Sequence, residues 1–144
     1  MATGSRNDPS GRFNFVLEID GVVTAAFEEV SGLASETAVI EYREGSDLAT
    51  VRKLPGLTRY ANLVLKRGIT KDRSLWNWRK AVIDGTPQRA SGSIVLLDES
   101  RKEVARWNFR QGWPCKWTGP TLNAQANEVA IETLEIAHEG LDLA

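Results

Sequence analysis

Apolar and polar residues alternate along much of this chain, which is the pattern of β-strands that bury one face. The first such stretch covers residues 13–19 and is followed by Asp20-Gly21, a dipeptide that favours a tight hairpin turn. Residues 22–30 are expected to return as the second strand. The side chains expected to face the core from the first strand are Phe13, Phe15, Leu17 and Ile19.

A third strand and a long loop are expected next. Residues 36–44 predict the strand, with Ala38, Ile40 and Tyr42 on one side. Residues 45–52 are mostly polar and predict a long loop or an extended hairpin tip.

Pro55-Gly56 predicts a turn, after which residues 57–67 predict a strand in which Leu63 and Leu65 face one way. Beyond Thr70 the apolar period becomes helical, which predicts a helix of about three turns lying over a sheet. Asn77, Lys80 and Asp84 lie on its polar side. The residues on its apolar arc are Leu75, Trp76, Trp78, Arg79, Val82 and Ile83.

The ends of this helix are signalled as well. Asp72 or Ser74 can accept hydrogen bonds from first-turn amides, and Gly85 can adopt the left-handed conformation after the last turn. Arg79 has two interpretations: its guanidinium reaches water from a buried stem, or it pairs with a carboxylate of a neighbouring strand or subunit.

After the helix, residues 91–97 form an apolar run typical of a strand covered on both faces. Residues 98–102 predict a turn. Residues 104–110 predict a strand, ended by Trp113-Pro114, with Ala105, Trp107 and Phe109 on one face.

Residues 116–126 read as irregular, and residues 128–138 as the final strand. In that strand Val129 and Ile131 lie on one phase, whereas Leu134 and Ile136 lie on the other. A bulge near Glu132-Thr133, or burial of both faces, accounts for this change.

The expected architecture is mainly β: an antiparallel β-barrel or sandwich of seven or eight strands, with one α-helix packed against it. Residues 1–11 are rich in Gly, Ser, Pro and Asn and are expected to form a flexible N-terminal arm. Residues 12–144 are expected to form a single domain.

Composition removes several classes of function. The 18 basic and 19 acidic residues give a net charge of −1, so no global field steers nucleic acid or an anionic membrane. A single cysteine excludes an intrachain disulfide and any multi-thiolate metal site. The polar start and the lack of a long apolar run predict a soluble protein made in the cytoplasm, with no membrane insertion as a monomer.

No phosphate-binding loop, nucleophile elbow, zinc helix or calcium loop occurs in the sequence, so neither a catalytic site nor a cofactor or metal site is expected. His138, the only histidine, is expected to bond to backbone or carboxylate, and Cys115 to act as a small buried hydrophobe. Trp76, Trp78 and Trp107 favour packing. Two alternatives stay open: a β-sandwich ligand-binding module with Trp113 and Trp117 as an exposed platform, and a hydrolase that depends on His138.

Six stretches, taken in order, resemble the tail-tube proteins of contractile phage tails and of extracellular contractile injection systems. The resemblance runs from about residue 13 to residue 141. The stretches are FNFVLEIDG with FEEVSGL, ETAVIEYREG, KLPGLTRYANLVLKRGIT, the LWNW start of the helix and NEVAIETLEIAHEGL.

This resemblance implies a β-barrel subunit, similar in fold to the haemolysin-coregulated tube protein of type VI secretion. It also implies hexameric rings that stack into a tube inside a sheath and deliver protein or DNA cargo through the lumen. Sheath protein and baseplate or hub proteins are the implied partners, and the assembled particle the site of action. A baseplate ring or tube-initiator paralogue is the alternative within the family.

The expected stacking element is the loop of residues 45–52. It is too long for a tight hairpin and carries two apolar residues among polar ones, which a lone monomer gains little by exposing. The residues of this loop are Gly45, Ser46, Asp47, Leu48, Ala49, Thr50, Val51 and Arg52.

Overall fold

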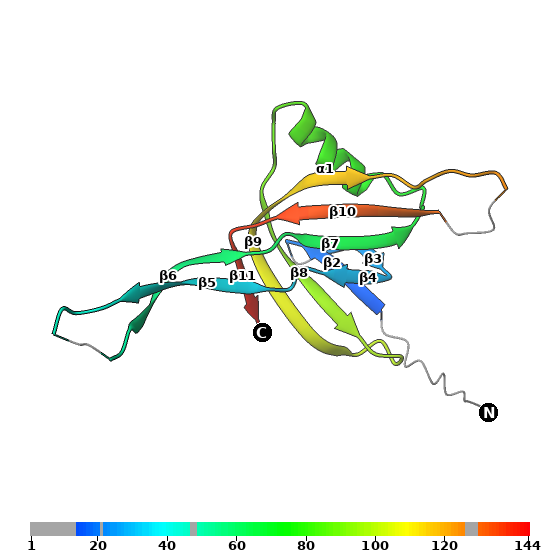
Figure 1. The fold of residues 1–144 in the computed structure, drawn as a ribbon. Helices are drawn as coiled ribbons and strands as arrows, with labels where there is room; N and C mark the ends of the chain where they lie inside the picture. Colours follow the sequence, from blue (N-terminus) through cyan, green and yellow to red (C-terminus); the bar gives the residue numbers. More distant parts are fainter. Residues whose placement is uncertain (1–13, 21, 47–48, 126–129) are drawn as a thin grey trace.

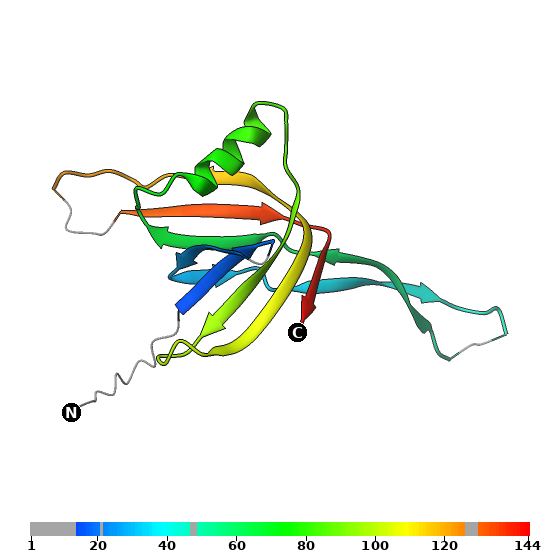
Figure 2. The ribbon, with the colours of Figure 1, turned by 180° about the vertical axis from the view of Figure 1, so that it is seen from behind.

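The computed structural model describes residues 14–20, 22–46, 49–125 and 130–144. Within these ranges eight strands form one antiparallel sheet in the order β3-β2-β8-β9-β10-β7-β4, with β11 paired to β9. Two further strands, β5 and β6, form a separate ribbon, and the helix α1 packs against β9 (Figure 1, Figure 2). The mainly antiparallel β-fold with one helix, expected from the sequence, is confirmed.

The elements are β2 (Asn14–Ile19), β3 (Val22–Phe27), β4 (Glu29–Ser31), β5 (Ser35–Tyr42), β6 (Arg52–Tyr60), β7 (Leu63–Gly68), α1 (Ser74–Ile83), β8 (Ala90–Leu97), β9 (Glu103–Thr118), β10 (Ile131–Ala137) and β11 (Gly140–Leu143).

The sheet closes on itself through residues 22–31, where the sequence predicts one strand over residues 22–30. This stretch pairs with β2 in its first half, as β3, and with β7 in its second half, as β4. The change of partner occurs at Glu28, whose amide donates to the carbonyl of Lys66. Because both edges of the sheet lie on one continuous stretch, the sheet curls into a barrel.

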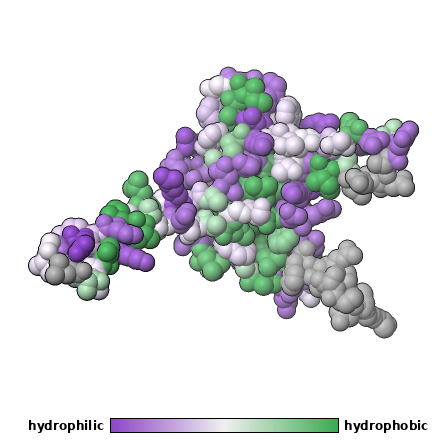
Figure 3. Space-filling model, in the orientation of Figure 1, coloured by the Kyte–Doolittle hydropathy of each residue, from purple (hydrophilic) through white to green (hydrophobic). Residues whose placement is uncertain are grey.

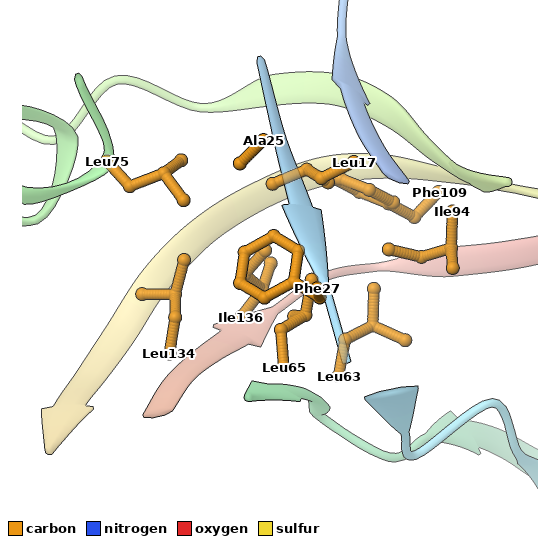
Figure 4. Close-up of a cluster of buried hydrophobic side chains, with 10 residues drawn as sticks. All are labelled: Leu17, Ala25, Phe27, Leu63, Leu65, Leu75, Ile94, Phe109, Leu134 and Ile136. Atoms are coloured by element: carbon orange, nitrogen blue, oxygen red, sulfur yellow. The ribbon is translucent and has the colours of Figure 1, made fainter. Parts of the chain in front are cut away.

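The interior of this barrel is apolar and tightly filled (Figure 4). Strands β3, β7 and β10 each contribute two alternate residues, as the period of two requires, and β2, β8, β9 and α1 contribute one each. The run in β8 is covered on both faces, since Ile94 and Val95 are both buried. The cluster consists of Leu17, Ala25, Phe27, Leu63, Leu65, Leu75, Ile94, Phe109, Leu134 and Ile136.

Strand β9 is longer than the sequence predicts and joins two parts of the sheet. It pairs with β8 and β11 in its first half and with β10 in its second half. Trp113-Pro114 was expected to end it, but it continues to Thr118. Pro114 is tolerated because it lies beside the register shift between β9 and β10, where the regular ladder is interrupted.

The phase change in the last strands has a different cause from the expected bulge near Glu132-Thr133. Strand β10 pairs with β7 in regular register, and Glu132 occupies a core-facing position opposite Arg67. The Arg67 Nε donates to Glu132 Oε2 at 2.7 Å, and the guanidinium lies 5.5 Å from the Phe27 ring centre. A buried ion pair therefore continues the row of Leu134 and Ile136. Nor is this strand the last, because β11 follows it.

Candidate assembly surface

A β-ribbon formed by β5 and β6, here called the β5–β6 ribbon, projects from the barrel (Figure 1). Its strands pair with each other over nearly their whole length, from Ser35↔Tyr60 to Tyr42↔Arg52. Every residue of β5 is exposed, and so are most residues of β6. An isolated two-stranded ribbon is only marginally stable in water. We therefore expect another protein surface to pack against it.

One face of the ribbon carries an apolar stripe. Directly paired residues share a face, which places Ile40 beside Leu54 and Tyr42 beside Arg52. Gly56 lies under Ile40, since a Cβ at that position would stand 3.2 Å from the Ile40 side chain. The grouping of Ala38, Ile40 and Tyr42 on one side agrees with the sequence pattern, but this side is exposed.

The opposite face is apolar as well. It carries the pair Val39–Pro55, whereas the register shift leaves Gly56 and Leu57 together opposite Ala38, on the side of Ile40. Val39 is 63% exposed and Leu57 is 76% exposed. The pair Glu41–Lys53 places opposite charges on the same face. Figure 3 shows hydrophobic residues on the part of the projecting arm nearer the barrel, whereas its outer part is mostly hydrophilic.

The predicted stacking loop forms the tip of this ribbon. Gly45 and Ser46 lie in a turn after β5, Val51 is exposed, and Arg52 begins β6. Asp47 and Leu48 lie outside the described residues, and Ala49 and Thr50 are exposed.

The sequence analysis underestimated the ribbon in two ways. Pro55-Gly56 was expected to be a turn but lies within β6, and the stretch 57–67 is divided between β6 and β7 by Ala61 and Asn62. Leu54 and Leu57 were not singled out. Their alternation was visible, but a strand pattern does not tell whether a core lies next to the strand.

The helix α1 presents a second surface, and its residues divide between core and solvent. Leu75 is buried and joins the core, and Trp78 packs partly against it while its Nε1 donates to the Gln88 carbonyl at 2.7 Å. Trp76 is 36% exposed and packs edge to face on Trp117, with the two ring centroids 5.4 Å apart. Val82 is half-buried.

One residue of the helix arc departs from expectation: Ile83 is 58% exposed, in the last turn of the helix, so most of its side chain is not covered by the sheet. Arg79 is half-buried, and its Nη1 donates to the backbone carbonyl of Pro114 at 3.4 Å. At the other end, the Ser74 amide donates to Asp72 Oδ1 at 2.9 Å.

The residues considered for catalysis are held by backbone and packing contacts. Both ring nitrogens of His138 lie at hydrogen-bond distance from carbonyl oxygens, of Gly140 and Ala61. Burial raises the pKa of the Cys115 thiol, and the nearby Glu135 carboxylate raises it further. Among the described residues no group of three His, Cys, Asp or Glu could hold a metal ion.

The tryptophans expected to form a ligand platform are engaged elsewhere. Trp117 packs on Trp76, and Trp113 lies 6.0 Å from the Arg89 guanidinium. Both are half-buried. In the described part of the chain no helix is long and apolar enough to cross a membrane.

The chain matches a known protein family in sequence and several solved structures in fold. The family described as T4-like virus tail tube protein gp19 matches residues 11–142. No curated protein sequence matches the chain. Among solved structures, a chain of the PVC sheath-tube complex of an extracellular contractile injection system, in the extended state, superposes with a TM-score of 0.80. The two share 22% identity over 94% of this chain and 90% of the other.

Two further structures are similar. A chain of the 6-fold symmetrised baseplate of the anti-feeding prophage gives a TM-score of 0.76 at 26% identity, over 98% of this chain and 97% of the other. Hcp1 from Flavobacterium johnsoniae gives 0.55 at 14% identity, over 90% and 93%.

Proposed function

This chain belongs to the family of T4-like virus tail tube proteins, and from that premise we propose that it builds hexameric rings that stack around a central channel. The tube is the inner tube of a contractile injection system or phage tail, and cargo, either protein or DNA, passes through its lumen. Such a role is structural and requires no catalytic residue.

The observation that carries this proposal is the β5–β6 ribbon. A Leu or Val side chain gains about 1.5–3 kcal/mol when it moves from water to a fully buried site. Val39, Ile40 and Leu57 are each more than half exposed, so their burial gives several kcal/mol per subunit contact. Both faces of the ribbon carry apolar side chains. A partner that packs on one face alone therefore leaves the apolar side chains of the other face exposed to solvent.

The occupant we propose for both faces is another copy of the same chain. In a stack of rings each subunit has neighbours beside it and neighbours above or below it, which supplies two different covers for one ribbon. A contact of this head-to-tail kind repeats without closing and so extends into a tube. The tip, residues 45–52, then docks on the adjacent ring.

The partners we propose follow the similar structures, which come from sheath-tube, baseplate and tube-terminating assemblies. Sheath protein surrounds the tube, and baseplate or hub proteins hold its end. The chain is made in the cytoplasm and acts in the assembled particle. Residues 12–144 act as one tail-tube domain, with residues 1–11 as a flexible arm.

A second candidate is a ring of the baseplate or a tube initiator. It is favoured by the baseplate chain of the anti-feeding prophage, which shares 26% identity with this chain. The two roles differ in the length of the assembly that the purified protein forms. A main tube subunit polymerises with itself without limit, whereas an initiator stops at one ring until another protein extends it.

Electron microscopy and mass measurement of the purified protein test the proposal. We expect rings of six times the 15.9 kDa subunit, growing into tubes of one diameter as concentration rises. Single rings that never lengthen favour the initiator. A protein that stays at the subunit mass at high concentration, with no rings by microscopy, contradicts both roles.

Paired variants test the ribbon. Val39→Ser combined with Leu57→Ser removes apolar area from both faces of the ribbon and is expected to abolish assembly while leaving the thermal transition of the subunit nearly unchanged. Val39→Ile combined with Leu57→Met keeps the area and is expected to assemble normally. Leu48→Ser with Val51→Ser tests the tip, and tubes of normal length from it exclude the tip as the stacking element.

A further inference from the structure

His138 sits where the β5–β6 ribbon leaves the barrel. Its Nε2 lies 2.9 Å from the carbonyl oxygen of Ala61, the residue that follows β6. Its Nδ1 lies 3.0 Å from the carbonyl oxygen of Gly140, the first residue of β11. The imidazole therefore bridges the end of the ribbon to a strand of the barrel.

Rings hold the imidazole in this orientation. The Tyr60 ring, at the end of β6, is 5.6 Å from it, and the Phe109 ring of β9 is 6.2 Å from it. Ala61 is also tied to the other side of the ribbon, since its amide donates to the Ala34 carbonyl at 3.2 Å. Ala61 is therefore connected to both strands of the ribbon, to β6 through the chain and to the start of β5 through this hydrogen bond.

The chemistry of the bridge depends on the proton count of the ring. A carbonyl oxygen only accepts hydrogen bonds, and a neutral imidazole carries one N–H, so it can donate to one of the two oxygens. The second contact then places a ring lone pair against a carbonyl lone pair. The imidazolium carries two N–H groups and donates to both oxygens.

Few charged groups face this site from the elements packed around it. From β9 comes the Arg110 guanidinium, which lies close against Gly140. Glu139 beside the ring is paired with Arg89 at 2.8 Å. On β10, Glu135 accepts a hydrogen bond from Asn62 at 3.0 Å, and the Cys115 thiol lies near it. Tyr60 contributes a phenol.

We propose that His138 is a pH-operated clamp on the β5–β6 ribbon. When the ring is protonated it fastens Ala61 and Gly140 together and holds the base of the ribbon in place. When the ring loses its proton one fastening is lost, and the base of the ribbon opens more often. This property belongs to the single subunit and does not depend on whether the chain builds tubes.

The first test uses the unaltered protein, in which the only histidine gives one assignable set of imidazole signals. Nitrogen NMR of the labelled ring at about pH 5.5 and about pH 8 spans the range in which histidine changes charge. We expect two protected N–H groups at the lower pH and one at the higher pH. Two freely exchanging N–H groups at low pH contradict the clamp.

The second test measures hydrogen exchange of the ribbon at the same two pH values, after correction for the intrinsic exchange rate. A hydrogen bond to a charged group supports about a tenfold change in the opening equilibrium. Residues 35–61 are therefore expected to be about tenfold better protected at low pH, while the core strand β8 changes little. Equal protection at both pH values overturns the proposal.

His138→Gln provides the control, because its carboxamide NH2 can still donate to a carbonyl oxygen and the group does not titrate. Its ribbon is expected to exchange alike at both pH values. If the pH difference survives in this variant, another group is responsible, such as the chain's α-amino group, which titrates near the same range. If the variant does not fold, the two measurements on the unaltered protein decide the matter.

Discussion

Gly32 is the residue on which the base of the ribbon most depends. Its φ is +88°, and a Cβ there would stand 1.9 Å from the backbone oxygen of Asn62. Gly85 has nearly the same φ, +87°, but a Cβ there would meet nothing within 4 Å. The two glycines therefore have the same left-handed backbone conformation. They differ in whether an added Cβ would clash with a neighbouring chain segment.

We expect Gly32→Ala to destabilise the subunit much more than Gly85→Ala. Left-handed backbone costs a residue with a Cβ about 1–2 kcal/mol, and that is the whole expected cost at Gly85. At Gly32 the backbone contact adds to it, because two chain segments must separate. Denaturant titration of both variants measures the difference, and equal losses would show that the contact relaxes freely.

Cys115 allows a prediction from its raised pKa. A raised pKa leaves less thiolate at a given pH, and the thiolate is the reactive form. Alkylation of the native protein at about pH 8 is therefore expected to be slower than alkylation of the same protein unfolded in denaturant. Equal rates would show that the thiol is neither desolvated nor shielded.

Sequence reasoning works at the residue scale where a side chain satisfies its own neighbourhood. The Asp98 carboxylate accepts hydrogen bonds from the amides of Ser100 and Lys102, which is typical of the turn that the sequence predicts. Arg79 could not be placed in this way. Its acceptor is a carbonyl of β9, 35 positions away, and no local pattern announces such a partner.

At the scale of elements, α1 separates buried from exposed positions within ten residues. Leu75→Ala removes a fully buried side chain from the core and is expected to cost about 2–5 kcal/mol. Ile83→Ala, at the exposed end of the same helix, is expected to stay within about 0.5 kcal/mol. Chemical denaturation of the two variants measures both values, and a large loss at Ile83 would mean that the helix end is covered.

The strands of the barrel were predictable because their period reports a core beside them. β7 follows that period directly, whereas β8 was predictable as an apolar run covered on both faces. Strand β5 follows the same period without a core, so this strand was expected and its exposure was not, whereas the first half of β6 was expected to be loop and turn. The pairing of Glu132 with Arg67 hid the inward face of β10, because an inward carboxylate reads as polar until its partner is known.

For the whole molecule, the ribbon is separable from the barrel. The Ala61 amide donates to the Ala34 carbonyl, so the two chain ends at its base are already adjacent. Replacing residues 36–59 by a short Gly-containing turn is expected to leave a folded barrel with nearly the same thermal transition that no longer assembles. Circular dichroism and sedimentation test this, and a barrel that unfolds without the ribbon contradicts it.

The exposure of the β5–β6 ribbon also affects how this chain can change over evolutionary time. Core positions such as Leu17 and Ile136 are constrained by the chain's own fold, and a change in one can be compensated by a neighbour in the same subunit. Val39 and Leu57 are mostly exposed in the subunit, so under the proposed function their constraint comes mainly from the copy that covers them. Substitutions on the ribbon should therefore covary with the surface that receives it, and subunits from diverged lineages should fold together in one cell and still sort into separate tubes.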